Sequence, residues 1–127
     1  MREAFARVPF ARLLGIELAQ LEKGTATLRL PVREELQRNN GLMHGGATAS
    51  LIDTASAFAI LTLLESREMT ITVDLTIHYL RPILEGTATA RARVLRAGRR
   101  LITVSVDVYD EAENLAATAL TTHARRG

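Results

Sequence analysis

A single carboxylate inside an apolar segment is the side chain best placed for chemistry. Asp53 is the one charged residue between Ala47 and Leu64, eighteen residues dominated by Ala, Leu, Ile and Phe. A carboxylate that loses hydration there needs a partner, and in a dry site it can act as general base or nucleophile. The residues one helical turn away are small, which leaves room for a ligand: Ala49, Ser50, Ser56 and Ala57. The pattern therefore predicts an enzyme built around Asp53.

His44, Gly45 and Gly46 directly precede this segment. Glycines at the start of a helix let a ligand approach the backbone closely, and the first N–H groups of a helix have no partner within it. The helix dipole adds positive potential at the same end. Fixed donors in such a position stabilise an oxyanion, so the start of the segment is a second candidate for chemistry.

The apolar segment has two other interpretations. Asp53 can be a structural acid that is paired with a Thr or Arg from elsewhere in the fold. Eighteen mostly apolar residues also approach the length of a membrane helix. Ser and Thr residues dilute the segment and amphipathic strand patterns follow it, so we expect no membrane helix.

The elements that must position these residues follow from hydrophobic periodicity. The apolar segment predicts one long buried helix from about Gly46 to Glu65. Before it, the sequence predicts a short helical segment interrupted near Pro9 (3–13), two strands (15–22 and 25–32) and a loop (33–43). After it, alternation with a period of two predicts strands over 71–79, 87–94, 102–108 and about 114–125. We therefore expect an α+β fold in which five or six antiparallel strands curl around the central helix.

Composition limits the other function classes. The 127 residues are expected to form one domain, 1–127, with an ordinary hydrophobic content of 47%. The absence of Cys excludes disulfides and thiolate chemistry, and three separated His give no ligand spacing, so no metal site is expected. No basic block is interleaved with aromatics, so no nucleic-acid partner is expected. The N-terminus lacks an apolar signal core, and we expect a soluble, cytoplasmic protein.

Taken together, the chain resembles the hotdog-fold thioesterases, in particular the phenylacetyl-CoA thioesterase (PaaI-like) family. The residues that carry the resemblance are the turn 41–46 with its His44, Asp53 nine residues later, Val73-Asp74 and Tyr79-Leu80-Arg81-Pro82. Their spacing, the order of elements and the chain length agree with the family over essentially the whole chain. The resemblance implies a hotdog fold, an antiparallel β-sheet wrapped around one long central α-helix.

The resemblance also implies an acyl-CoA thioesterase that releases a free acid and CoA without a cofactor or metal. In that family, the Gly45 N–H polarises the thioester carbonyl, and His44 holds the carbonyl or the geometry of the site. Gly46 belongs to the same substrate-binding turn. Asp53 acts either as general base toward water or as nucleophile through an anhydride, and both routes stay open.

The spacing between His44 and Asp53 has a consequence for assembly. Nine residues of helix span roughly 13 Å, so the His44 of one subunit should not reach its own Asp53. In the family, two subunits pair so that His44 and Gly45 of one face Asp53 of the other. We therefore expect a homodimer at least, and the two-faced strands leave room for a homotetramer.

Two positions depart from the family pattern. Many members carry Asn or Gln six residues before His44, where this chain has Arg38, and the nearby Asn40 is a candidate to take that role. Thr72 stands where some relatives use a Ser or Thr to hold the attacking water. Strand alternation puts Thr72 opposite the apolar face of its strand, so it reaches the site only if the strand twists or starts later.

Four arginines are expected to contact the phosphates of CoA, because guanidinium groups bind phosphate in a bidentate manner: Arg81, Arg96, Arg99 and Arg100. The stretch 96–100 can equally be a solvated hairpin tip. His78 is expected at the surface or in a subunit contact. His123, near the end of the last strand, is interpreted as incidental.

Two rival functions accompany the thioesterase hypothesis. The alternative is a non-catalytic hotdog protein that binds acyl thioesters without hydrolysing them, and Arg38 is the residue that supports it. The weaker rival is a hotdog dehydratase acting on acyl thioesters. Those enzymes lack the His-Gly-Gly to Asp arrangement that this chain carries.

Overall fold

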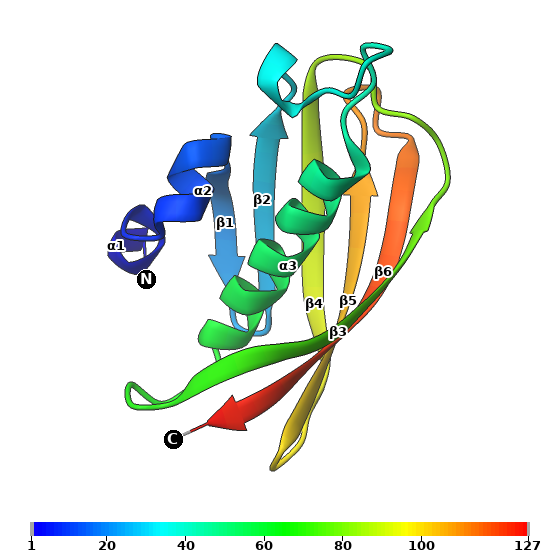
Figure 1. Cartoon of the computed structure of the whole chain (residues 1–127). Coiled ribbons are helices and arrows are strands. Elements are labelled where there is room, and N and C mark those ends of the chain that lie inside the picture. The colour runs from blue at the N-terminus through cyan, green and yellow to red at the C-terminus, as the bar shows by residue number, and fades with distance from the viewer. Residues whose placement is uncertain (1, 127) are drawn as a thin grey trace.

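In the computed structural model, which describes residues 2–126, one curved antiparallel sheet wraps around a long helix (Figure 1). The six strands lie in the order β1-β2-β4-β5-β6-β3. Their bounds are β1 Glu17–Glu22, β2 Thr25–Pro31, β3 Met69–Tyr79, β4 Thr87–Ala97, β5 Leu101–Tyr109 and β6 Leu115–Arg126. The predicted α+β hotdog fold, with the sheet around one central helix, is confirmed.

Helix α3 (Gly45–Leu61) is shorter than the sequence predicts, and the expected end near Glu65 is wrong. Thr62 takes the C-cap position, where its hydroxyl donates to the Ala59 carbonyl at 2.6 Å and accepts the Gly24 N–H at 2.7 Å. The second of these bonds joins the end of the helix to the turn between β1 and β2. The chain then turns toward the start of β3.

Two short helices precede the sheet, α1 (Arg2–Ala6) and α2 (Pro9–Leu14). Pro9 lies in the first turn of α2, where its missing N–H breaks no helical bond, so the predicted interruption near Pro9 is confirmed. The predicted loop over 33–43 contains one 3-10 turn, Glu34–Leu36, and is otherwise irregular.

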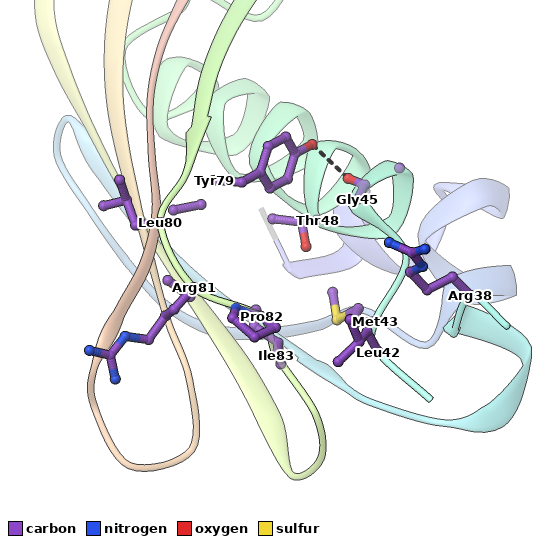
Figure 2. A pocket seen from close by; sticks show the side chains of 13 residues that line it. Arg38, Leu42, Met43, Gly45, Thr48, Tyr79, Leu80, Arg81, Pro82 and Ile83 are labelled. Atoms are coloured by element: carbon purple, nitrogen blue, oxygen red, sulfur yellow. Dashed lines mark hydrogen bonds between the residues drawn. The ribbon is translucent and has the colours of Figure 1, made fainter. Parts of the chain in front are cut away.

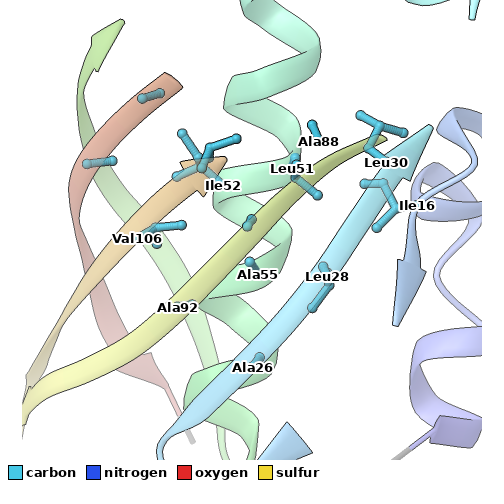
Figure 3. Close-up of a cluster of buried hydrophobic side chains, with 14 of the residues drawn as sticks. Ile16, Ala26, Leu28, Leu30, Leu51, Ile52, Ala55, Ala88, Ala92 and Val106 are labelled. Atoms are coloured by element: carbon cyan, nitrogen blue, oxygen red, sulfur yellow. The ribbon is translucent and has the colours of Figure 1, made fainter. Parts of the chain in front are cut away.

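Small side chains let α3 lie close against the sheet. Ala88, Ala90 and Ala92 on β4 are buried. Ala55 on α3 lies over the strand between Ala88 and Ala92 (Figure 3). Larger buried residues fill the space around them: Leu28, Leu30, Leu51, Ile52 and Val106. Because such close packing leaves little freedom, it fixes the helix axis on the sheet and with it the position of every residue of α3.

A bulge in β3 decides which of its side chains face α3. The β3–β6 register shifts between Thr72, which lies opposite His123, and Asp74, which lies opposite Thr122. The extra residue, Val73, reverses the alternation, so Thr72 shares a face with the residues at odd positions that follow: Leu75, Ile77 and Tyr79. The predicted simple alternation over 71–79 is therefore wrong at the start of the strand, and Val73 is exposed.

Candidate active site

His44 directly precedes the first residue of α3 and is its N-cap. Its ring Nδ1 accepts the Gly46 N–H at 2.8 Å, so a neutral ring carries its proton on Nε2. The cap holds the ring beside the first turn of the helix. Because His44 is exposed, its Nε2–H can donate to a ligand at this end of α3.

Gly45 is the first residue of α3, and its N–H lies at the positive end of the helix dipole. Among the residues that the structure describes, no group accepts a hydrogen bond from this N–H. The Gly45 carbonyl accepts the Tyr79 hydroxyl at 2.8 Å, which ties the first turn of α3 to the end of β3 (Figure 2). Burial raises the pKa of Tyr79, which keeps its hydroxyl protonated as the donor of this bond.

A pocket of about 560 Å³ opens beside the start of α3 (Figure 2). Its wall includes Arg38, Gly45, Gly46, Thr48, Tyr79 and Arg81, and apolar side chains form most of the rest. The guanidinium of Arg38 lies on the side where α3 begins, whereas that of Arg81 points away from the cavity (Figure 2). The structure thus brings Gly45, Gly46 and Arg81 to one cavity, together with the unusual Arg38.

Asp53 lies about two turns further along α3, and it is half-buried rather than enclosed. The Thr72 hydroxyl on β3 donates to its Oδ1 at 2.8 Å. Thr72 reaches the carboxylate although simple alternation places it on the opposite face, because the bulge at Val73 turns it inward. The acid therefore has the threonine partner that a carboxylate in this position requires.

Behind Thr72 lies His123, and its interpretation as incidental is wrong. The ring is 1% exposed, with Nδ1 3.4 Å from the Thr72 Oγ1 and Nε2 2.9 Å from the Thr121 Oγ1. Burial lowers the pKa of His123, and the charges of Asp53 and Asp74 oppose that shift. One sequence signal could have placed this ring inside: it continues the period-two series of small inward residues on β6, Ala117, Ala119 and Thr121.

Helix α3 separates the candidate groups into two sets. We call His44 and Gly45 the carbonyl half-site, and Asp53 and Thr72 the carboxylate half-site. Gly45 and Asp53 are eight residues apart on one helix, about 12 Å along its axis. Asp53 is not among the residues that line the pocket at Gly45. Within one subunit, the two half-sites therefore do not share a cavity.

The remaining predicted residues lie elsewhere. Arg96, Arg99 and Arg100 are exposed on the β4–β5 hairpin, at the end of the sheet away from the start of α3 (Figure 1). Asn40 lies in an exposed turn and does not line the pocket, and His78 is exposed as predicted. No helix within residues 2–126 is long and apolar enough to cross a membrane. In the same part of the chain, no cluster of His, Asp or Glu is placed to hold a metal ion.

Comparison with known proteins identifies one family. The thioesterase superfamily is the family whose sequence model matches the chain, over residues 40–117. A Saccharolobus solfataricus protein named "Putative esterase" is 39% identical over 86% of this chain and 72% of that protein. The Escherichia coli medium/long-chain acyl-CoA thioesterase YigI is 30% identical over 91% of this chain and 84% of YigI. The solved structure of E. coli PaaI, from the phenylacetic acid degradation operon, has a TM-score of 0.91 at 25% identity and covers 99% of this chain and 90% of PaaI.

The buried, neutral His123 predicts a stability that depends on pH. Because burial lowers its pKa below the ordinary value of about 6.5, the unfolded chain binds the proton more readily than the folded one. The free energy of unfolding should therefore be maintained above about pH 7 and should fall as the pH decreases below about 6.5. Urea unfolding of the native protein and His123→Leu, between about pH 7.5 and 5, measures the difference, and the variant should lose less stability.

Other titrating groups change the free energy of unfolding at lower pH. The pKa values of Glu68 and Asp110 are lowered by hydrogen bonds, above all from backbone N–H groups. Their contribution is present above the ordinary carboxyl value of about 4 and is lost only as the pH falls below it. An identical decrease in the native protein and His123→Leu above pH 5 would contradict the assignment to His123.

Proposed function

The chain belongs to the thioesterase superfamily, and on that basis we propose that it is an acyl-CoA thioesterase, which hydrolyses a thioester to a free acid and CoA. The observation that carries the proposal is the Gly45 N–H, which has no hydrogen-bond acceptor among the described residues. Gly45 lines a pocket at the positive end of the α3 dipole. The relative named medium/long-chain acyl-CoA thioesterase, which is 30% identical over 91% of this chain, supports the same substrate class.

In this proposal, the thioester carbonyl binds at the start of α3. The Gly45 N–H and the helix dipole stabilise the oxyanion that develops on the carbonyl oxygen. The Nε2–H of His44, fixed by the cap, donates to the same oxygen or holds the thioester in place. Gly46 keeps this turn free of a side chain, since a Cβ there would lie 3.0 Å from the His44 Nδ1.

Asp53 supplies the second half of the chemistry. As general base, it removes a proton from water while the water oxygen attacks the carbonyl carbon; the tetrahedral intermediate then expels the CoA thiolate, which takes up that proton. As nucleophile, it forms an anhydride with release of the thiolate, and water then cleaves the anhydride. In either route the Thr72 hydroxyl, bound to Oδ1, orients the carboxylate.

We assign the two half-sites of one active site to two subunits, because neither subunit alone brings them together. Strand β3 is an edge of the sheet, and it is eleven residues long. Met69, Ile71 and Val73 are exposed along it. A long edge strand with exposed apolar residues favours pairing with another strand, and a second copy of β3 is the simplest partner.

Antiparallel pairing of two β3 strands would join the half-sites. Two hydrogen bonds join α3 to β3, one between Asp53 and Thr72 and one between Gly45 and Tyr79. If the two-fold axis lies midway between Thr72 and Tyr79, each Thr72 lies opposite the partner subunit's Tyr79. Asp53 then lies near the partner subunit's Gly45. A homotetramer would be built from such dimers through another surface.

Thiol release tests the proposed activity. The native protein should release CoA from at least one of a panel of short, medium, long and aryl acyl-CoAs, and Asp53→Asn should lower kcat by on the order of 10²–10⁴-fold because it removes the base. A thiol-reactive dye measures the product, and the protein adds no background because it contains no Cys. The matched control is Asp107→Asn, since Asp107 also accepts a threonine hydroxyl, from Thr118 at 2.7 Å, and should keep its kcat.

Two results would contradict this assignment in different ways. If Asp53→Asn keeps the kcat of the native protein, Asp53 takes no part in the reaction. No turnover by the native protein, with acyl-CoA still bound, would select the non-catalytic binding protein. Arg38 would then be the residue to change first, because it lines the pocket and departs from the family pattern noted in the sequence.

A mixture of two impaired variants tests the shared site. Gly45→Pro removes the N–H at the first helical position, where Pro fits the helix and the extended backbone of His44. Loss of one oxyanion donor should cost about 10²–10³-fold in kcat. The control is Gly45→Ala, which keeps the N–H and whose Cβ would lie at an ordinary 3.5 Å from the Tyr79 ring.

Co-expression of Gly45→Pro with Asp53→Asn should restore about a quarter of the native activity. Half of randomly assorted dimers contain one subunit of each kind, and each such dimer holds one intact site. Activity that stays at the level of the single variants would contradict the shared site. So would an active species that sediments as a monomer.

Arginine substitutions test the proposed contact with the CoA phosphates. Arg81→Gln should raise KM several-fold and leave kcat unchanged, because the phosphate contact is equally strong in the ground state and the transition state. The hairpin arginines can reach the same pocket only from the partner subunit, so the triple change of Arg96, Arg99 and Arg100 to Gln tests that arrangement. Arg93→Gln, at an exposed site on β4, is the control. If KM is unchanged, the substituted arginine does not contact the CoA phosphates.

A further inference from the structure

His123 is a buried ring that the proposed chemistry does not yet use. It lies on the inward side of β6, directly opposite Thr72 on β3, and is 1% exposed. Both ring nitrogens face hydroxyl groups, Nδ1 toward Thr72 and Nε2 toward Thr121. Burial of an imidazole is costly unless its nitrogens have partners, so the direction of each hydrogen bond decides the state of the ring.

The hydroxyl groups behind the ring fix its tautomer. Ser56 donates its proton to the Ile52 carbonyl at 2.9 Å, within the same helix. Ser56 Oγ can therefore only accept from Thr121, whose Oγ1 lies 3.0 Å away. Thr121 has then used its one proton, so it must accept from His123, and Nε2 carries the ring proton.

Nδ1 of His123 therefore carries no proton and can accept a hydrogen bond. The Thr72 hydroxyl has one proton, and it donates that proton to the Asp53 Oδ1 at 2.8 Å. Its distance of 3.4 Å to Nδ1 is longer than an ordinary hydrogen bond, as expected for an oxygen whose proton points elsewhere. The hydroxyl of Thr72 thus lies between two acceptors, the carboxylate on one side and the imidazole on the other.

We propose that His123 is a positioning residue that acts on Asp53 through Thr72, because its Nδ1 accepts a hydrogen bond from the Thr72 hydroxyl whenever Asp53 is protonated. While Asp53 is a carboxylate, Thr72 donates to it. When Asp53 takes the proton of the attacking water, its oxygen becomes the weaker acceptor, and the Thr72 hydroxyl turns to donate to Nδ1. No covalent bond to His123 forms, no proton is transferred to it, and its own proton stays on Nε2. This role rests on the proposed thioesterase function with Asp53 as general base.

Three substitutions separate this role from a structural one. His123→Leu removes both contacts of the ring. His123→Asn keeps an oxygen acceptor close to the position of Nδ1. Thr121→Val removes the acceptor for the Nε2 proton, so that the proton can move to Nδ1 and block it. The control is Thr118→Val on the same strand, since Thr118 donates to Asp107 and lies outside the chain of hydroxyls.

The expected kinetic result is a change in kcat with KM retained. His123→Leu and Thr121→Val should each lower kcat by roughly tenfold, the scale of one unsatisfied hydrogen bond. His123→Asn should have a kcat close to that of the native protein. Thr118→Val should keep the native kcat. An unchanged kcat in His123→Leu would overturn the proposal, and so would equal losses in His123→Asn and His123→Leu.

A spectroscopic measurement needs no turnover. Nitrogen-15 NMR of the native protein should show His123 protonated on Nε2 and unprotonated on Nδ1. Asp53→Asn should lower the pKa of His123 further, because the Asp53 charge is one of the two that raise it. A proton on Nδ1 in the native protein, or no change in Asp53→Asn, would overturn the proposal even if His123→Leu fails to fold.

The thioesterase function and the role of His123 can be contradicted separately. If the native protein releases no thiol, the thioesterase function fails and this role fails with it. If the native protein is active and Asp53→Asn is inactive, but the His123 variants keep full kcat, only the role of His123 is overturned.

Discussion

Helix α3 holds the Gly45 N–H and the Asp53 carboxylate about 12 Å apart along its axis. An oxyanion donor acts over about 3 Å, and a base acts on the water beside the same carbonyl over a similar distance. One copy of the helix therefore cannot apply both groups to one thioester. The alanines of β4 pack tightly against α3, so the helix cannot bend or slide enough to bring Gly45 and Asp53 together. The free edge of β3, which lies beside both groups, is where a second copy would supply what the first lacks.

Strand β3 is the element that relates the two half-sites to each other. It holds the carbonyl half-site through the bond between Tyr79 and the Gly45 carbonyl, and it holds the carboxylate half-site through the bond between Thr72 and Asp53. The bulge at Val73 makes both contacts possible from one face of one strand. Without the extra residue, a strand that turns Tyr79 toward the helix would turn Thr72 away from it. A local irregularity in an edge strand is thus a condition for the chemistry that we propose for the helix.

The sequence was sufficient for the features that depend on local periodicity. The apolar segment after Gly46 and the alternation in β4, β5 and β6 predict a helix wrapped by an antiparallel sheet, and the fold confirms it. The bulge has no comparable signal, because one extra residue leaves the pattern of side chains intact until its partner strand is known. The contact of Thr72 with His123 joins residues 51 positions apart, so it depends on the β3–β6 register rather than on either segment alone. The helix end at Leu61 likewise depends on the Thr62 contact with the distant Gly24.

The polar chain from Ser56 through Thr121 to His123 lies in a core that consists mostly of alanine and aliphatic residues. Its hydrogen bonds offset the cost of burying these groups, but apolar residues of similar shape would fill the same space with comparable stability. Stability alone therefore does not explain its presence. One end of the chain is a helix carbonyl, and the other is the hydroxyl that contacts Asp53. The outer end of this network contacts the carboxylate and its inner end fixes the tautomer of a histidine, as the role that we propose for His123 requires.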